Sequence, residues 1–247
     1  MAMFVKEERV DSFDKFIEVT LKLNLRIDLP GKSFTIYRGQ EIDKSLLPSI
    51  ARDSSLSLEE ILKKEKDIFE EFRRLSYPYL DSNLQSDDEW VLLALAQHHR
   101  LPTRLLDWTR NPLAALWFAC IKDKEKDDDS DRIVWLLAVN ESDIVNLVTK
   151  AESPFAQNKT KVFRPNHITK RITSQNGWFT VHTFEKGKII PLNEIVIYSL
   201  RMIKIRIPET IRNDILNKLD IMGINNLSLF PDLEGLSQYL KWRNNIK

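Results

Sequence analysis

Residues 95–119, LAQHHRLPTRLLDWTRNPLAALWFA, are mostly apolar, yet histidines, arginines and an aspartate interrupt them. An apolar segment of this length is expected in a protein interior, where an unpaired charge costs several kcal/mol. Arg104 and Asp107 therefore need partners in the fold, and one solution is that they pair with each other. No other feature of the chain constrains the fold as tightly.

Two interpretations of this segment remain open. In the structural one, the five donors of Arg104 hold loop carbonyls and Asp107, while His98 or His99 caps the C-terminal end of a helix. In the functional one, the same residues line a polar pocket over a tryptophan-rich wall. Adjacent residues on a helix point about 100° apart, so at most one of the two histidines faces such a pocket.

Composition limits the broad class of the protein. A chain of 247 residues that is 43% hydrophobic can bury a sizeable core, as one large domain or two small ones. A net charge of +1 creates no global attraction to nucleic acid or membrane. No stretch approaches the roughly 18 apolar residues of a membrane span. The single cysteine, Cys120, excludes an internal disulfide framework and favours a reducing compartment, so we expect a cytoplasmic protein.

Several helices can be predicted from caps and apolar spacing. Residues 11–23 begin with the capping candidates Asp11 and Ser12, residues 55–75 contain a capping box at Ser57 and Glu60, and a further helix from residue 87 must end before Pro102. Residues 111–121, 208–223 and a segment from about residue 231 are also predicted helices. The apolar faces predicted for the first two helices comprise Phe13, Phe16, Ile17 and Leu21, and Leu58, Ile61, Leu62, Phe69, Phe72 and Leu75.

Strands are predicted at residues 33–39, 132–139, 177–184 and 194–207. The first delivers Arg38 at its end, and the second is apolar enough to be covered on both faces. The highly charged residues 122–131 form a solvated loop. These elements predict a single α+β domain over residues 1–247, with a helix-rich N-terminal half packed on a mostly antiparallel sheet.

Three sequence blocks resemble the FRG domain family, which is named for a Phe/Tyr-Arg-Gly motif. The motif is Tyr37-Arg38-Gly39, and the second block, Gln-His-aromatic-Gly-Leu-Pro-Thr-Arg-Leu-Leu-Asp-Trp-Thr, matches Gln97, His98 and residues 101–109. The third block matches Arg171, Ile172, Gln175, Gly177, Phe179 and Thr180. Arg100 stands where the family favours glycine. A left-handed helix cap there would be strained, so a turn that differs from that of the family is an alternative.

The resemblance places the chain among proteins found mainly in bacteria and phage-related contexts, and it suggests an ADP-ribosyltransferase-like sheet that binds NAD or a related nucleotide. In that superfamily an arginine at the end of the first core strand holds a phosphate or ribose, as Arg38 would here. Thr109 matches the Ser/Thr-bearing element, and Gln175 stands where a catalytic glutamate is expected. Tyr37, His98, Arg104, Asp107 and Phe179 are then candidate substrate-binding residues. The same pocket is expected to take a nucleotide-like small molecule.

The missing glutamate leaves two alternatives. Either an acid comes from elsewhere, with Asp107, Glu185 and Glu194 as candidates, or the domain binds without reacting. Arg38 itself either binds ligand or pairs with a carboxylate of the helix at residues 55–75.

Other functions find weaker support in the sequence. A binding module for nucleic acid or a protein partner is the alternative, because Lys159, Lys161 and Arg164 precede Trp178 and Phe179. A metal-dependent hydrolase lacks the usual ligand spacing. Its candidate ligands would be His98, His99, His167, His182 and Asp107.

Overall fold

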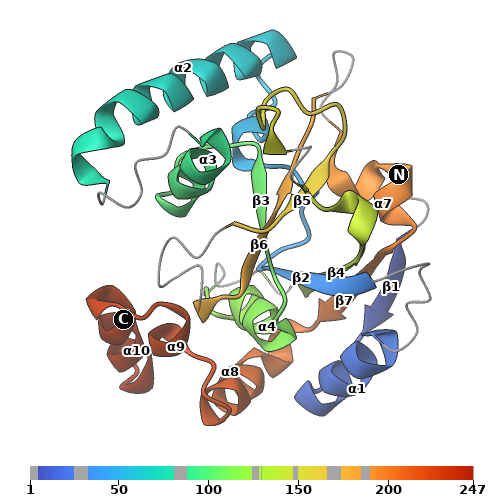
Figure 1. The fold of residues 1–247 in the computed structure, drawn as a ribbon. Coiled ribbons are helices and arrows are strands. Elements are labelled where there is room, and N and C mark those ends of the chain that lie inside the picture. The colour runs from blue at the N-terminus through green and yellow to red at the C-terminus, as the bar shows by residue number, and fades with distance from the viewer. Residues whose placement is uncertain are drawn as a thin grey trace.

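A computed structural model of the chain describes residues 5–24, 33–80, 88–123, 128, 130–146, 150–165, 174–184 and 190–246. These residues contain one seven-stranded sheet with the order β1-β7-β4-β2-β3-β6-β5 (Figure 1). Strands β1 and β7 are parallel and the other neighbours are antiparallel. The strands are β1 (Lys6–Arg9), β2 (Ser33–Gln40), β3 (Leu105–Thr109), β4 (Arg132–Asn140), β5 (Lys161–Phe163), β6 (Gly177–Val181) and β7 (Met202–Ile207). The prediction of a mixed fold with a mostly antiparallel sheet is confirmed.

Strand β4 lies between β2 and β7 and is buried along residues 132–139. Its nearly continuous apolar sequence, RIVWLLAV, suits a strand that is covered on both faces. Strands β2 and β3 share a single registered pair, Tyr37 with Thr109. The sheet is therefore continuous through β4 but only weakly joined between β2 and β3.

Helices cover both faces of the sheet, and they begin where the sequence supplies caps. Ser57 and Glu60 form the predicted capping box of α2, and Asp88 and Asn111 cap α3 and α4. The helices are α1 (Phe13–Asn24), α2 (Leu58–Ser76), α3 (Glu89–His98), α4 (Pro112–Cys120), α7 (Val196–Ser199), α8 (Arg212–Ile221), α9 (Asn226–Leu229) and α10 (Leu233–Arg243). None of the described helices combines the length and apolarity needed to cross a membrane.

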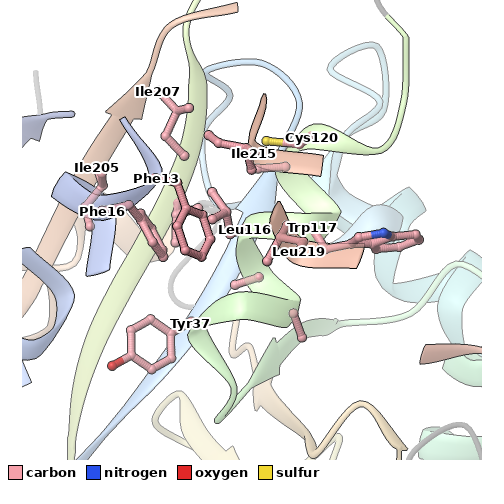
Figure 2. Packing of buried hydrophobic residues seen from close by; sticks show 14 of the residues in the cluster. Phe13, Phe16, Tyr37, Leu116, Trp117, Cys120, Ile205, Ile207, Ile215 and Leu219 are labelled. Atoms are coloured by element: carbon pink, nitrogen blue, oxygen red, sulfur yellow. The ribbon is translucent and has the colours of Figure 1, made fainter. Parts of the chain in front are cut away.

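The largest apolar cluster packs α1, α4 and α8 against one face of β2, β4 and β7. Figure 2 shows its centre, where Phe13 and Phe16 of α1 meet Leu116 of α4 and Ile205 of β7. The opposite face carries a second cluster that contains Trp108, Trp135 and Trp178. Helices α2 and α3 cover β3, β5 and β6 through a third cluster. Cys120 is buried in the first cluster.

Several predictions about the elements are wrong. Residues 194–207 are not strand throughout, because the helix α7 precedes the strand β7 within this segment. Leu21, Leu62 and Leu75 are 60%, 39% and 52% exposed, so the buried stripes of α1 and α2 run through neighbouring positions instead. A helix-rich N-terminal half is not confirmed, because β1, β2 and β3 lie there and helices continue to residue 243. Strands β1, β3 and β5 were not predicted as strands.

Candidate functional site

A cleft of about 910 Å³ opens beside the end of β2. Its walls come from β2 and the loop that follows it, the C-terminal end of α3, strand β3, helix α4 and Phe230. Most of the site residues singled out from the sequence line it: Tyr37, Arg38, His98, Asp107, Thr109 and Gln175. The fold therefore brings residues from three distant sequence blocks to one place.

Cationic side chains outnumber carboxylates in this cleft. The cationic residues of its lining are Arg38, Lys44, Arg52, Arg100 and Lys122, and the carboxylates are Glu41 and Asp107. Lys122 and Glu41 partly offset each other at 3.5 Å. The chain as a whole is nearly neutral, so the excess is local. A concave surface lined by one sign of charge attracts ligands of the opposite sign.

Arg38 lies where β2 and β3 cease to be paired. Its Nη1 donates to the main-chain oxygen of Asp107 at 2.7 Å and lies 3.7 Å from the Asp107 carboxylate. The side chain is only 14% exposed, and its Nε atom is buried with no hydrogen-bond partner among the described residues. Burial lowers the pKa of the Arg38 guanidinium, Asp107 opposes that shift, and repulsion from Arg52 adds to it. The charge of Arg38 is thus only partly compensated by the protein.

The Phe/Tyr-Arg-Gly motif has a direct structural explanation. Successive side chains of a strand point to opposite faces, so Tyr37 and Gly39 lie on the face under α4 while Arg38 lies on the other. A β-carbon at Gly39 would overlap the carbonyl oxygen of Ala115 and lie 2.6 Å from the amide nitrogen of Ala119. Glycine therefore lets α4 lie directly on β2 and fixes the strand that carries Arg38.

Asp107 belongs to a chain of hydrogen bonds that joins α3 to β3. Gln97 Nε2 donates to its carboxylate at 2.8 Å, and Thr103 Oγ1 donates to Gln97 Oε1 at 2.6 Å. The Leu105 amide closes the chain by donating to Thr103 Oγ1 at 3.1 Å. The Asp107 side chain is 60% exposed toward the cleft. Its charge therefore needs no burial, which removes part of the conflict between apolar sequence and ionisable groups.

Thr109 and Gln175 hold the wall of the cleft together. The Thr109 hydroxyl donates to the Gln175 main-chain oxygen at 2.6 Å and accepts from the Asn111 amide at 3.0 Å. Gln175 Nε2 donates to the Leu229 main-chain oxygen at 3.1 Å. These bonds place Phe230, which follows Leu229, against the cleft. The Thr109 hydroxyl and the Gln175 side-chain nitrogen are therefore already engaged within the protein.

Arg104 and Phe179 do not line the cleft. Arg104 does not pair with Asp107, which was one of the open alternatives. It forms a two-pronged ion pair with Glu65 of α2 at 2.9 and 2.5 Å, and both side chains are at most 4% exposed. Its guanidinium also lies over the rings of Phe155 and Phe184. Glu65 was missed, although it stands between Ile61 and Phe69 on the buried stripe of α2. A carboxylate at a core position of a helix is the signal that could have revealed it.

His182 is a buried neutral histidine that connects the two arginine regions. Trp108 Nε1 donates to Thr180 Oγ1 at 3.0 Å, and Thr180 Oγ1 forms a second hydrogen bond with His182 Nε2 at 3.2 Å. Burial, reinforced by repulsion from Arg38 and Arg104, lowers the pKa of His182 to about 3. The imidazole is therefore uncharged at neutral pH.

The end of α3 keeps a left-handed cap despite Arg100. Arg100 has φ = 66°, and its amide bonds to the Gln97 oxygen while the Leu101 amide bonds to the Ala96 oxygen. This is the Schellman arrangement that glycine usually completes. Of the two adjacent histidines only His98 lines the cleft, as predicted.

The remaining candidates lie elsewhere. Glu194 is exposed and lies outside the cleft, so the carboxylates that line the cleft are Glu41 and Asp107.

The basic residues proposed for nucleic-acid binding are partly engaged. Lys161 donates to the Ser142 main-chain oxygen, and Arg164 lies over Trp178. Trp178 and Phe179 are 5% and 4% exposed, which leaves neither ring open for base stacking. Lys159 is outside the cleft as well. The described residues contain no cluster of potential metal ligands, and Glu185, His167, Arg171 and Ile172 fall outside these residues.

Comparison with known proteins agrees with the motif blocks. Residues 33–128 match the family model of the FRG domain. This match includes Arg38, the Gln97–Asp107 hydrogen bond and Thr109, while the block around Gln175 lies beyond it. No curated protein and no solved structure matches the chain. Residues 33–128 are therefore similar to the FRG domain.

Proposed function

We propose that the cleft binds an anionic, nucleotide-like ligand and that Arg38 holds its phosphate. The observation that carries the proposal is the arrangement of the Arg38 guanidinium. Nη1 is tied to Asp107, whereas Nε is buried without a partner and Nη2 forms no hydrogen bond within the described residues. The Nε–Nη2 edge is the fork that binds phosphate or carboxylate oxygens in pairs.

The rest of the cleft suits a nucleotide better than a simple ion. Phe118 and Phe230, whose ring centroids are 6.1 Å apart, line the same cleft and offer apolar surface for a planar base. The volume of about 910 Å³ falls within the usual range of small-molecule sites. Arg52 and Arg100 supply further positive charge at the cleft. A phosphate at one end and a ring at the other would use both parts of the lining.

NAD is the ligand class that we propose to test first, in an ADP-ribosyltransferase-like reaction. Release of nicotinamide develops positive charge on the ribose, which a nearby carboxylate would stabilise. Asp107 supports this role, since its carboxylate is exposed to the cleft beside Arg38. In this proposal Thr109 and Gln175 shape the site, because their hydroxyl and amide groups hold other parts of the wall.

The test compares binding with turnover. Calorimetry with NAD and ADP-ribose should detect binding to the full chain, and Arg38→Met should weaken it by about tenfold to a hundredfold, which corresponds to loss of a charged hydrogen bond. Arg74→Met, which removes an exposed arginine of α2 paired with Glu71, is the matched control and should change nothing. Binding that is equal in the wild type and the Arg38 variant would refute the proposal.

A nicotinamide-release assay then separates the enzyme from a binding module. Release that is lost in Asp107→Asn, with ADP-ribose binding retained, would support catalysis. Binding without release would leave a nucleotide-binding domain that does not react.

A further inference from the structure

We propose that Gln40 is a second phosphate-binding residue of the cleft and makes it selective for ligands with two linked phosphates. This inference rests on the proposed function, because it adds a residue and a ligand class to the same site. Gln40 lines the cleft two positions after Arg38 at the end of β2.

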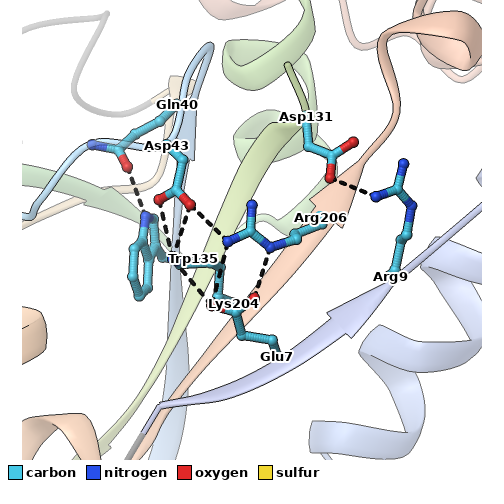
Figure 3. Close-up of polar contacts among 8 residues, drawn as sticks. All are labelled: Glu7, Arg9, Gln40, Asp43, Asp131, Trp135, Lys204 and Arg206. Atoms are coloured by element: carbon cyan, nitrogen blue, oxygen red, sulfur yellow. Dashed lines mark hydrogen bonds and ion pairs between the residues drawn. The ribbon is translucent and has the colours of Figure 1, made fainter. Parts of the chain in front are cut away.

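The orientation of the Gln40 amide is fixed by a tryptophan. Trp135 Nε1 lies 2.6 Å from Gln40 Oε1, and an indole nitrogen can only donate a hydrogen bond. The oxygen of the amide must therefore face Trp135, and the nitrogen must face away from it. Figure 3 shows this directly: the oxygen of Gln40 meets the indole, and the nitrogen points to the opposite side.

Trp135 is held rigidly enough to impose this orientation. Its side chain is buried in β4, directly opposite Arg38 in the register of β2 and β4. Lys204 Nζ lies 4.8 Å from the centre of its ring and is bound in turn by Glu7 and Asp43 (Figure 3). A buried ring with a cation on its face has little freedom to release the Gln40 oxygen.

The two proposed phosphate-binding side chains lie on one face of β2. Arg38 and Gln40 point to the same face because Gly39 separates them, and they lie about 7 Å apart along the strand. Arg38 offers its Nε–Nη2 edge, and Gln40 offers an amide nitrogen that donates to no other partner within the described residues. Donors without acceptors suit phosphate oxygens, which only accept. The spacing suits two linked phosphates better than one.

Gln40 adds donors without adding charge. Arg52 already repels Arg38, so a further cation at position 40 would raise that repulsion before a ligand arrives. A neutral amide avoids this cost and still binds an anion.

The test measures binding of inorganic pyrophosphate, inorganic phosphate and ADP-ribose by calorimetry to the full chain and two variants. Gln40→Glu keeps an oxygen for Trp135 and removes the donors, and Gln40→Met removes the donors without adding charge. Both should weaken pyrophosphate and ADP-ribose binding by about tenfold. Inorganic phosphate, held by Arg38 alone, should lose about threefold or less in Gln40→Met. Gln238→Glu, an isosteric change on the exposed surface of α10, is the control and should leave binding unchanged.

The other outcomes contradict the inference, except for a binding deficit of Gln40→Glu that persists in high salt. If Gln40→Glu weakens binding and Gln40→Met does not, the added charge acts at a distance and Gln40 makes no contact. If Gln40→Met fails to fold, binding to Gln40→Glu is measured at low and high salt instead. A loss of affinity that disappears in high salt is caused by long-range repulsion, whereas the loss of a contact persists. Equal losses for phosphate and pyrophosphate would remove the diphosphate selectivity. If the wild type binds none of these ligands, the proposed function itself fails, whereas binding that depends on Arg38 and not on Gln40 overturns only the inference.

Discussion

Arg104 and Arg38 are both mostly buried arginines, but their surroundings differ in one decisive respect. Arg104 meets Glu65 through two hydrogen bonds and lies over two phenyl rings. Arg38 has one bond to a main-chain oxygen and a longer contact with a carboxylate that is itself mostly exposed. The first charge is fully compensated by the protein, and the second is not.

This difference separates a structural charge from a ligand-binding charge within one fold. A buried ion pair that satisfies both partners adds rigidity and leaves nothing for a ligand. A buried guanidinium with unpaired N–H groups facing a cleft has a desolvation cost that the protein offsets only in part. A bound anion would offset the rest. We therefore expect substitutions at Arg104 to act on stability and substitutions at Arg38 to act on binding.

The largest effect is expected at Arg104. Arg104→Met should leave Glu65 buried without a partner and lower the free energy of unfolding by about 3–5 kcal/mol. Urea denaturation measures this, and the double variant Glu65→Leu/Arg104→Met should recover most of the loss. Arg38→Met should cost about 1 kcal/mol or less, since one hydrogen bond is removed. Comparable losses at both arginines would erase the distinction.

Gly39→Ala should be the next largest change, and it tests whether packing rather than charge stabilises the Arg38 region. The added methyl group meets main-chain atoms of Ala115 and Ala119, which a side-chain rotation cannot relieve. We expect a loss of about 3 kcal/mol, the upper part of the range for overpacking. Gly223→Ala is an informative comparison, because its φ of 76° costs strain but its β-carbon would meet nothing within 4 Å. A smaller loss at Gly39 than at Gly223 would contradict this explanation.

The two arginines also show which parts of the fold can be predicted from the sequence and which cannot. Caps, apolar spacing and the β2 motif are local signals, and they correctly predicted α2, α3, α4, β2 and β4. The partner of Arg104 lies 39 residues away on α2, so the pair depends on how α2 packs in the fold and not on a local pattern. From the sequence, a carboxylate of that helix was an alternative partner for Arg38, whereas in the structure the carboxylate of Glu65 pairs with Arg104.

The candidate site was predictable in its members but not in its arrangement. The motif blocks named Arg38, Asp107 and Gln175, which do share a cleft. That β2 and β3 are joined at one residue pair, leaving space for the Arg38 guanidinium, depends on strand register, which no local pattern encodes. Gln40 was visible next to the motif, but its role depends on Trp135, which lies 95 positions away.

His182 reports on both arginines through its pKa, which is about 3 in the folded protein and about 6.5 when unfolded. A depressed histidine pKa contributes stability that is complete above the unfolded value and is lost as the pH falls toward 3. Between about pH 6 and pH 4 the wild type should lose up to 1.4 kcal/mol per pH unit more than His182→Gln does. His99→Gln, at an exposed position, should keep the wild-type slope.

The same histidine can reveal the state of Arg38. Repulsion from Arg38 helps to lower the His182 pKa, so Arg38→Met should raise it, and so should a phosphate bound to Arg38. An NMR titration of the His182 ring with and without ADP-ribose measures both shifts. A pKa that moves in neither case would place Arg38 too far from His182 for the proposed electrostatic link.

The smallest effect is expected at Arg100, and it is a gain. This residue adopts φ = 66° in the cap of α3, a conformation that glycine adopts without a steric penalty. Arg100→Gly should therefore raise the free energy of unfolding by about 0.5–1 kcal/mol, reduced by the greater freedom of glycine in the unfolded chain. Arg100 also contributes one of the cationic side chains of the cleft, so the same variant should bind phosphate ligands more weakly at low salt and equally at high salt. A stability gain with weaker low-salt binding would show that this chain retains a strained arginine for its charge, and unchanged binding would leave the strain without a ligand-binding explanation.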